Sequence, residues 1–430
     1  CSSSNKTTPQ AGALAQPNII VFLTDDQGYG DVGYNGSKIK TPHIDSLAKY
    51  GMTFTDFYVE NRCSPTRLAF MTGSYSHRAG HSKVIYRTQK IGINPAEITT
   101  AELLQQAGYA TALVGKWHLG EWEPFHPLNH GFDQSLTFLA SGKSNAGFAL
   151  YRDRELVDDR HKLRKTDGEF TPQLLQAGKD FITQNKDKPF FLFYATPTPH
   201  TPWIPNEQFA GSSPVGKYGD VVREIDWQVG ELVRTLEEHG VADNTLFVFT
   251  SDNGPVLREP GPEAGPLRGG KWSDFEGGIR VPTVMRWPAR IKPGSVNSEI
   301  TGIIDLLPTF CAVAGVEPPQ DRVIDGINVL PYLESQQLDE PIREVFIVPG
   351  SIIRMGQYKL LTKQLSYKGR GDKEVVHAQR WSLFDLANDI GETTDISAEN
   401  PEIVAKLKAR YEQEMALLNQ ATREIGRVSE

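Results

Sequence analysis

The sequence predicts an α/β protein with a mostly parallel (mixed) sheet sandwiched by helices, followed by a smaller C-terminal subdomain of antiparallel sheet and helix. Three observations support this prediction. Short apolar runs rich in β-branched and aromatic residues alternate with helical patterns, which is typical of a doubly wound core. Polar residues capable of chemistry follow several of these runs, and the pattern changes to short β-type runs after about residue 326.

Four apolar runs are predicted to be buried parallel strands because they are continuous rather than alternating. They cover residues 17–23, 110–115, 189–195 and 245–250. The residues that follow them are Asp25 and Asp26, Lys116 and His118, His200, and Asp252 and Asn253. Since ligands of α/β folds bind at the carboxyl ends of the strands, we expect one active site along this edge of the sheet.

Helical patterns separate these strands, and a different organisation follows them. The predicted helices cover residues 42–50, 99–107, 171–185, 218–239 and 304–314. Later β-type runs at 345–348, 358–362 and 381–385 precede a helical pattern at 402–419, whereas 140–165 and 363–380 are loop-like. The expected domains are a flexible tether at 1–16, a catalytic α/β domain at 17–330 and a C-terminal subdomain at 331–430.

Composition excludes several classes of function. A net charge of −8 argues against a general attraction to nucleic acid, and no apolar run reaches the 18 residues of a membrane span. Three cysteines rule out a disulfide framework. Cys1 stands before a Ser-rich stretch like that of a bacterial lipoprotein, and Cys311 is predicted to be a buried thiol. We therefore expect an exported periplasmic or cell-surface lipoprotein that touches the membrane only through a lipid on Cys1, although a sequence that begins there by chance would look the same.

The segment Cys63-Ser64-Pro65-Thr66-Arg67 is the most specific feature of the chain. A cysteine just ahead of Pro65 and a helical stretch is expected at a helix N-terminus, where backbone N–H groups favour developing negative charge. That position suits a reactive nucleophile. Alone, the five residues would also fit a helix that has a cysteine nearby by chance.

In context, the chain resembles the formylglycine-dependent (type I) sulfatases of the alkaline phosphatase superfamily. Their first signature, Cys-x-Pro-x-Arg, matches residues 63–67, and their second, Gly-Tyr-x-Thr-x-x-x-Gly-Lys-x-His, matches residues 108–118. The similarity runs from about 18 to 395. Asn61 and Arg62 depart from the family, which usually has small or apolar residues before the cysteine.

The resemblance implies a mechanism. In the family, a formylglycine-generating or anaerobic maturation enzyme oxidises the cysteine to an aldehyde. One hydroxyl of the hydrated aldehyde attacks sulfur, the alcohol leaves, and the sulfated hemiacetal collapses to release sulfate. Carried over to this sequence, Cys63 becomes the formylglycine, Arg67 and Lys116 brace its oxygens, Lys271 holds the sulfate, His200 protonates the alcohol, His118 assists the collapse and Asp252 takes the proton.

Asp25, Asp26, Asp252 and Asn253 form an all-oxygen set that fits a hard cation, together with the oxidised Cys63. We expect Ca²⁺ rather than Mg²⁺, with the role of holding sulfate and activating the attacking hydroxyl. Either pair of residues could also be an ordinary solvated turn. Finding both at the ends of buried strands favours one metal site.

The substrate is expected to be a sulfated polysaccharide or oligosaccharide, a carrageenan-like galactan ahead of glycosaminoglycans. Lys116, His200 and Lys271 would contact its sulfate. His130, with His126 nearby, and Arg370, in the basic stretch 363–380 that ends at Arg380, are the predicted sugar contacts. Two alternatives stay open: a phosphodiester or phosphonate ester hydrolase of the same superfamily, and a non-catalytic sulfated-glycan-binding lipoprotein whose Cys63 is never converted.

Overall fold

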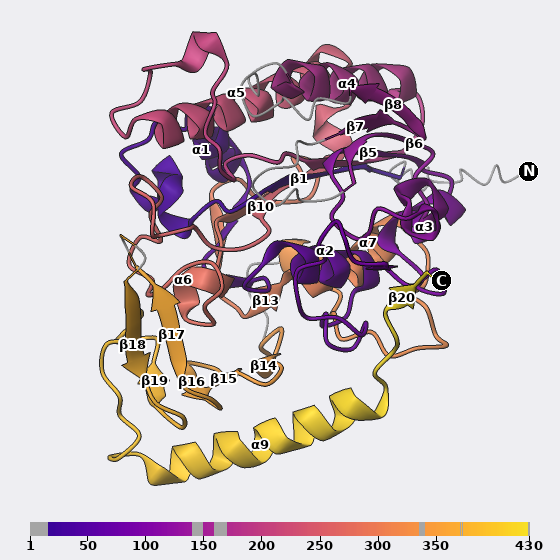
Figure 1. The fold of residues 1–430 in the computed structure, drawn as a ribbon. Coiled ribbons are helices and arrows are strands. Elements are labelled where there is room, and N and C mark those ends of the chain that lie inside the picture. The colour runs from indigo at the N-terminus through magenta and orange to yellow at the C-terminus, as the bar shows by residue number, and fades with distance from the viewer. Residues whose placement is uncertain are drawn as a thin grey trace, which may run out of the picture.

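The computed structural model describes residues 16–139, 149–158, 170–334, 340–369, 371 and 373–428. Its centre is a ten-stranded sheet in the order β12-β2-β11-β10-β1-β9-β5-β6-β7-β8 (Figure 1). The five central strands are parallel: β10 (Thr245–Ser251), β1 (Asn18–Thr24), β9 (Phe190–Ala195), β5 (Ala110–Lys116) and β6 (Gln134–Phe138).

Shorter strands extend the sheet on both sides. On one side these are β11 (Thr283–Arg286), β2 (Met52–Phe54) and β12 (Ser295–Asn297), and on the other β7 (Leu150–Arg152) and β8 (Glu155–Asp158). β11 and β7 each join the parallel centre in the antiparallel direction. The mostly parallel, mixed sheet predicted from the sequence is thus confirmed.

Helices cover both faces of the sheet, which explains why its central strands are apolar throughout. Ile20 and Phe22 of β1 share a buried cluster with α1 (Pro42–Tyr50), α4 (Phe170–Asn185) and α5 (Lys217–Glu238). Ile19 and Val21 of the same strand face the other cluster, with α2 (Cys63–Thr72), α3 (Thr100–Gln106) and α7 (Leu306–Ala314). Each such fully buried side chain contributes about 1.5–3 kcal/mol.

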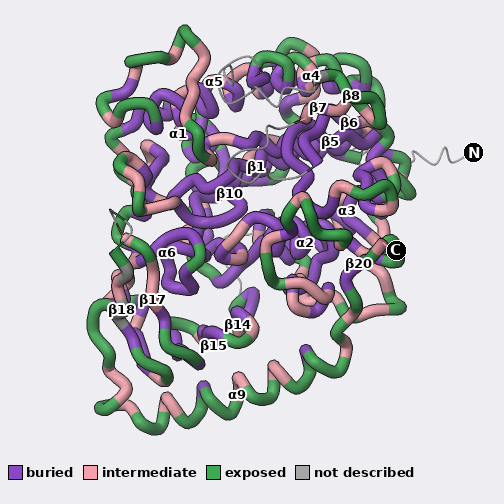
Figure 2. The backbone as a smooth tube through the Cα atoms, in the orientation of Figure 1, coloured by how far each residue is buried: buried purple, intermediate pink, exposed green. Residues whose placement is uncertain are grey.

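The C-terminal subdomain is a four-stranded antiparallel sheet backed by one helix. Its strands are β14 (Val345–Val348), β15 (Ile352–Met355), β16 (Tyr358–Leu361) and β19 (Leu383–Asp385). Helix α9 (Pro401–Gln420) lies along β15 and β16 and buries only Leu407 and Leu418, so most of its surface faces solvent (Figure 2).

Short elements tie the subdomain to the catalytic part of the chain. β20 (Gly426–Arg427) pairs with β4 (Ile91–Gly92). Within the catalytic part, β13 (Thr301–Gly302) pairs with β3 (Phe57–Tyr58). The helices α6 (Glu276–Ile279) and α8 (Leu330–Glu334) are each about one turn long. One hydrophobic cluster contains side chains of both parts, and the domain boundary at residues 330–331 stays a prediction.

Two segments expected to be loops contain hairpins instead. Part of 140–165 forms β7 and β8, and part of 363–380 forms β17 (Leu365–Lys368) and β18 (Glu374–Ala378). The sequence conceals them because neither hairpin has a continuous buried face, so the alternation that marks a half-buried strand is weak. The four long strands and five helices were predicted to within about two residues at each end.

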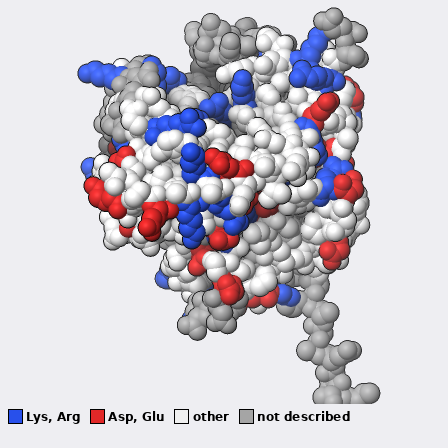
Figure 3. All heavy atoms as spheres, turned by 90° about the horizontal axis from the view of Figure 1, so that it is seen from below, with Lys and Arg blue, Asp and Glu red and all other residues white. Residues whose placement is uncertain are grey.

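The molecular surface mixes charges. Basic and acidic side chains are interspersed on the face that Figure 3 shows, as expected from 45 basic and 53 acidic residues. In the described ranges, no helix combines the length and apolar character needed to span a bilayer.

Candidate active site

The predicted edge of the sheet does bring the polar strand ends together. Thr24 at the end of β1 is in register with Ser251 at the end of β10, and the Asp252 N–H donates to the Thr24 carbonyl at 3.0 Å. Lys116 is the last residue of β5, two strands away. Asp25, Asp26, Asp252 and Lys116 therefore lie at one end of neighbouring buried strands.

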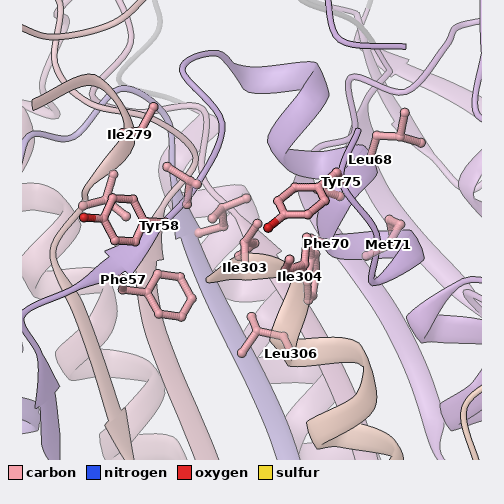
Figure 4. Close-up of a cluster of buried hydrophobic side chains, with 14 of the residues drawn as sticks. Phe57, Tyr58, Leu68, Phe70, Met71, Tyr75, Ile279, Ile303, Ile304 and Leu306 are labelled. Carbon is pink, nitrogen blue, oxygen red and sulfur yellow. The ribbon is translucent and has the colours of Figure 1, made fainter. Parts of the chain in front are cut away.

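Helix α2 presents Cys63 to this edge. The helix begins at Cys63, and every one of its ten residues is buried. Leu68, Phe70 and Met71 pack into the core beside Phe57 and the β13–α7 segment (Figure 4). Because the helix is locked on its apolar side, the position of its first residue is fixed relative to the sheet.

The thiol of Cys63 lies among the predicted ligands. Its Sγ is 3.3 Å from Asp25 Oδ1, 3.9 Å from Asp26 Oδ1 and 3.4 Å from Lys271 Nζ. One ligand atom each from Asp25, Asp26, Cys63 and Asp252 lies within 4.8 Å of all the others. Burial, reinforced by Asp25 and Asp252, raises the pKa of the Cys63 thiol, so the unmodified side chain is a poor nucleophile.

Three buried cations pair with the three carboxylates. Lys116 Nζ lies 2.5 Å from Asp25 Oδ2. Lys271 Nζ donates to both oxygens of Asp26, at 2.6 and 2.8 Å. Arg67 reaches Asp252 Oδ2 through Nη2 at 2.8 Å and through Nε at 3.1 Å.

These pairs hold the charges of the cluster. Burial acts to raise the pKa of Asp25, but Lys116 and the other nearby cations outweigh it and hold that pKa well below its usual range. Burial also opposes the charge of Lys271, and Asp26 outweighs it, so the Lys271 pKa is raised. Burial, followed by the charge of Asp25, instead raises the pKa of Asp252 to about 6. The formal charges of the three pairs cancel.

The donor set fits a hard cation. The side-chain amide of Asn253 donates to Asp26 Oδ1 at 2.7 Å and to the Gly254 carbonyl at 2.9 Å. Its carbonyl oxygen, Oδ1, is buried without a hydrogen-bond partner. Buried amide oxygens are rarely left unpaired, and this amide is bonded to Asp26, one of three clustered carboxylates that supply the oxygen ligands calcium and magnesium prefer.

Two histidines flank the cluster, as predicted. His118 has a left-handed backbone (φ 64°), its Nε2 is 3.1 Å from the Ile85 carbonyl, and its Nδ1 is buried without a partner. Burial and the nearby Lys116 lower its pKa well below the usual value, so the ring is neutral. His200 is partly exposed, with Nε2 3.7 Å from Asp26 Oδ2 and Nδ1 2.8 Å from the Thr201 carbonyl.

Among the described residues, the predicted sugar contacts His126 and His130 make no hydrogen bond or ion pair with this cluster. His130 has no exposed surface; its Nε2 is 3.2 Å from the Pro124 carbonyl and its ring packs near Trp117. His126 is also buried. Arg370 lies outside the described residues, and the Arg380 guanidinium rests over Trp381. The sugar-binding role of His130 and Arg370 stays a prediction.

Sequence reasoning missed two residues beside the cluster. Trp272 follows Lys271 and is 40% exposed, which is unusual for so large an apolar side chain. Gln27 follows Asp26 and is completely buried, with neither polar side-chain atom hydrogen-bonded. Their only signal in the sequence is adjacency to a predicted site residue.

Comparison with known proteins agrees with this geometry. Residues 17–316 match the family model "Sulfatase", and residues 271–419 match "N-sulphoglucosamine sulphohydrolase, C-terminal". An N-acetylgalactosamine-6-sulfatase of Mus musculus is 41% identical over 379 residues, which cover 81% of this chain and 72% of the relative.

Solved structures share the fold. A structure from work on glycosaminoglycan metabolism by Bacteroides thetaiotaomicron has a TM-score of 0.84 at 28% identity and covers 93% of this chain and 99% of that one. Ps i-CgsB in complex with k-i-k-neocarrahexaose has a TM-score of 0.80 at 33% identity, with 95% and 94% covered. The chain belongs to the sulfatase family of the alkaline phosphatase superfamily and is a sulfuric ester hydrolase.

Proposed function

We propose that the chain releases sulfate from a sulfated glycan by means of a formylglycine formed from Cys63, with Ca²⁺ bound by Asp25, Asp26, Asp252 and Asn253. The observation that carries the proposal is the placement of Cys63 Sγ. It lies within 3.4 Å of both the Asp25 carboxylate and the Lys271 ammonium. Asn253, whose amide oxygen has no partner, donates to the neighbouring Asp26.

The charge of the cluster supports an anionic substrate. Three carboxylates balance three cations, so a bound divalent ion would leave the site with a formal charge of about +2. The released sulfate carries a charge of −2, and fixed positive groups aimed at such oxygens stabilise the charge that develops as the ester breaks. A neutral substrate would gain nothing from this arrangement.

The chain's own residues supply the remaining steps. An oxidised Cys63 would provide the hydroxyl that attacks sulfur, and the ion would polarise the sulfate oxygens. Lys271 and Lys116 hold oxygens around Cys63. His200 is the only partly exposed member of the set. Burial lowers its pKa against the opposing effect of Asp26, so it would have to be protonated in the substrate complex before it gives a proton to the departing alcohol. His118, held neutral by burial, can accept a proton on its unpaired Nδ1 when the intermediate collapses.

The proposed substrate is a galactose-configured sugar that carries a sulfate ester. One similar protein is named for N-acetylgalactosamine 6-sulfate, and another is described in complex with a neocarrahexaose. Both names point to galacto sugars, which agrees with the expectation of a carrageenan-like galactan without excluding an amino sugar. We further propose that the protein is exported, that Cys1 carries a lipid and that a maturation enzyme oxidises Cys63.

One observation weighs against a phosphodiester or phosphonate ester hydrolase with two metal ions. Only one group of three or more metal-binding side chains is found among the described residues, and it is the cluster at Cys63. A non-catalytic glycan binder would leave Cys63 as a thiol, so its chemical state in the native host decides between enzyme and binder.

The test is sulfate release from protein coexpressed with a maturation enzyme. The panel contains carrageenan oligosaccharides, N-acetylgalactosamine 6-sulfate, chondroitin sulfate oligosaccharides and an aryl sulfate, with Cys63→Ala as the control and mass spectrometry of the Cys63 peptide. We expect an aldehyde at position 63 and release from a galacto substrate by the wild type alone. An aldehyde with no release from any substrate would refute the proposal.

A further inference from the structure

We propose that Trp272 and Arg258 form a saccharide subsite at the mouth of the sulfate pocket, where the indole meets the C–H face of a sugar and the guanidinium pairs with a second anionic group on the glycan. The inference rests on the proposed function and adds to it the part of the substrate beyond the sulfate. It predicts that the preferred ligand is a polyanionic oligosaccharide rather than an isolated sulfate ester.

The position of the indole is the first argument. The centre of the Trp272 ring is 5.3 Å from Lys271 Nζ, and the same Nζ lies 3.4 Å from Cys63 Sγ. A sulfate held by Lys271 would therefore place the sugar carbon that bears it next to the indole.

The backbone of Trp272 is the second argument. It adopts a left-handed conformation (φ 70°), which is strained for a bulky residue, while its N–H donates to the Asn61 carbonyl at 2.9 Å. The strain is not offset by burial, because the side chain remains 40% exposed. The chain thus holds a large aromatic ring at the mouth of the site where a small or polar residue would be easier to accommodate.

Charge around the ring is the third argument. The Arg258 guanidinium lies 4.9 Å from the Trp272 ring centre, and Arg258 is exposed. Gly371, which lies between β17 and β18 in the sequence, donates its N–H to the Arg258 carbonyl at 3.3 Å. Lys368 and Lys373 are exposed. Since Arg258 and Lys271 both lie over the indole, the exposed remainder of the ring suits a sugar that is apolar on one face and anionic at its rim.

Tyr50 provides a matched control. It is 48% exposed and has Lys49 Nζ 5.1 Å from its ring centre, so it too is an exposed aromatic ring under a cation. It is the last residue of α1 and borders a pocket with Trp227 and Arg234 of α5, which contains none of the catalytic residues. Loss of this ring tests for general effects of removing a surface aromatic.

The experiment compares Trp272→Ala, Trp272→Phe, Arg258→Gln and Tyr50→Ala in the converted full-length protein. Two quantities are measured: kcat/KM for a sulfated tetrasaccharide that the wild type cleaves, and competitive inhibition by inorganic sulfate, which carries no sugar. We expect Trp272→Ala to lower kcat/KM at least tenfold through KM, with the sulfate inhibition constant within twofold of wild type. Trp272→Phe should keep most of the wild-type kcat/KM. Arg258→Gln should lower kcat/KM more for multiply sulfated substrates than for singly sulfated ones. Tyr50→Ala should change neither kcat/KM nor the sulfate inhibition constant.

Two results would overturn the subsite. An unchanged KM in Trp272→Ala shows that the ring does not meet the sugar. Equal losses of saccharide turnover and of inorganic sulfate binding show that Trp272 only positions Lys271. Neither result affects the proposed function, because sulfate release by the wild type is measured separately. If the wild type releases no sulfate although the aldehyde is confirmed, the proposed function is refuted instead.

Discussion

Two buried clusters of this protein have the same formal charge and different surroundings. At the catalytic edge, Asp25, Asp26 and Asp252 face Arg67, Lys116 and Lys271. At the junction with the C-terminal sheet, Asp56, Glu276 and Glu392 face Arg280, Arg354 and Lys359. Each contains three carboxylates and three cations. Buried charge alone therefore does not mark an active site.

The difference lies in what surrounds the ion pairs. The centre of the junction cluster is enclosed: Lys359 Nζ is 2.8 Å from both Glu276 and Glu392, and these three residues have no exposed surface. Tyr58 donates to Glu276 at 2.6 Å, and the other three members, Asp56, Arg280 and Arg354, border a surface pocket. The catalytic cluster includes a thiol, the unpartnered oxygen of Asn253 and a partly exposed histidine. Glu392 Oε1 of the junction also makes no hydrogen bond, but it lies 2.8 Å from the Lys359 ammonium. The catalytic cluster differs in combining a thiol and an unpartnered amide oxygen with a partly exposed histidine.

The largest expected effect tests the junction cluster. Lys359→Met leaves Glu276 and Glu392 buried without their shared cation, so the free energy of unfolding should fall by about 3–5 kcal/mol. Denaturant unfolding measures this loss. Activity per folded molecule should stay at the wild-type value; a fall in kcat at low denaturant would show that the junction takes part in the reaction.

The same substitution at the catalytic edge should act on turnover. Lys271→Met removes the ammonium that contacts Asp26 and Cys63, and the expected loss in kcat/KM is about 10²–10³-fold, or about 2.7–4 kcal/mol. Sulfate release under saturating metal measures it. Turnover within threefold of wild type would mean that this cluster, like the junction cluster, stabilises the fold and does not take part in the reaction.

The two clusters should also differ in whether their variants keep the stability gained from bound metal. Ca²⁺ at about one hundred times its Kd should raise the free energy of unfolding by about 2.7 kcal/mol, and a chelator should reverse the gain. Asn253→Ala removes the buried oxygen without a partner and should abolish most of this gain, whereas Lys359→Met should retain it. Thermal unfolding with Ca²⁺, Mg²⁺ or chelator separates the two ions; no gain with either contradicts the metal site.

The smallest effect concerns a residue between the clusters. Asp274 accepts hydrogen bonds from Asn61 and from Ser351 at 2.5 Å, and pairs with the half-exposed Lys363 at 3.1 Å. Asp274→Asn keeps the shape but loses the charge, so unfolding should become easier by about 1–2 kcal/mol. Turnover of an aryl sulfate should change less than threefold. Lys363→Met, which loses only a solvent-screened pair, is the control and should cost under about 1 kcal/mol.

The sequence predicts the catalytic edge better than the junction, for a physical reason. Asp25, Lys116 and Asp252 come at the ends of apolar runs in the sequence. Because these runs form parallel strands of one sheet, their carboxyl ends meet at one edge, and the sequence alone predicts that the three side chains lie there. Glu276, Arg354 and Lys359 lie on a one-turn helix and short strands of another sheet. Their meeting depends on how two parts of the chain dock, which no local pattern encodes.

The same reasoning explains what was missed at the site itself. Trp272 lies in a loop whose backbone conformation is set by its bond to Asn61, a residue noted only as a departure from the family. The sequence predicts loops at 140–165 and 363–380, where the structure has hairpins, because neither hairpin has a continuous buried face that would produce alternating apolar residues. Residues placed by loops and docking thus escape prediction, whereas those placed by strand ends do not.

Once the protein has folded, another enzyme cannot reach Cys63 at the start of helix α2. All of its residues are buried, and Leu68, Phe70 and Met71 are packed in the core, so reaching Cys63 would require opening that core. The proposed oxidation of Cys63 would therefore have to precede folding of each chain. Molecules that folded first would keep a thiol at position 63, and the specific activity of a preparation would record how many chains had been oxidised during synthesis.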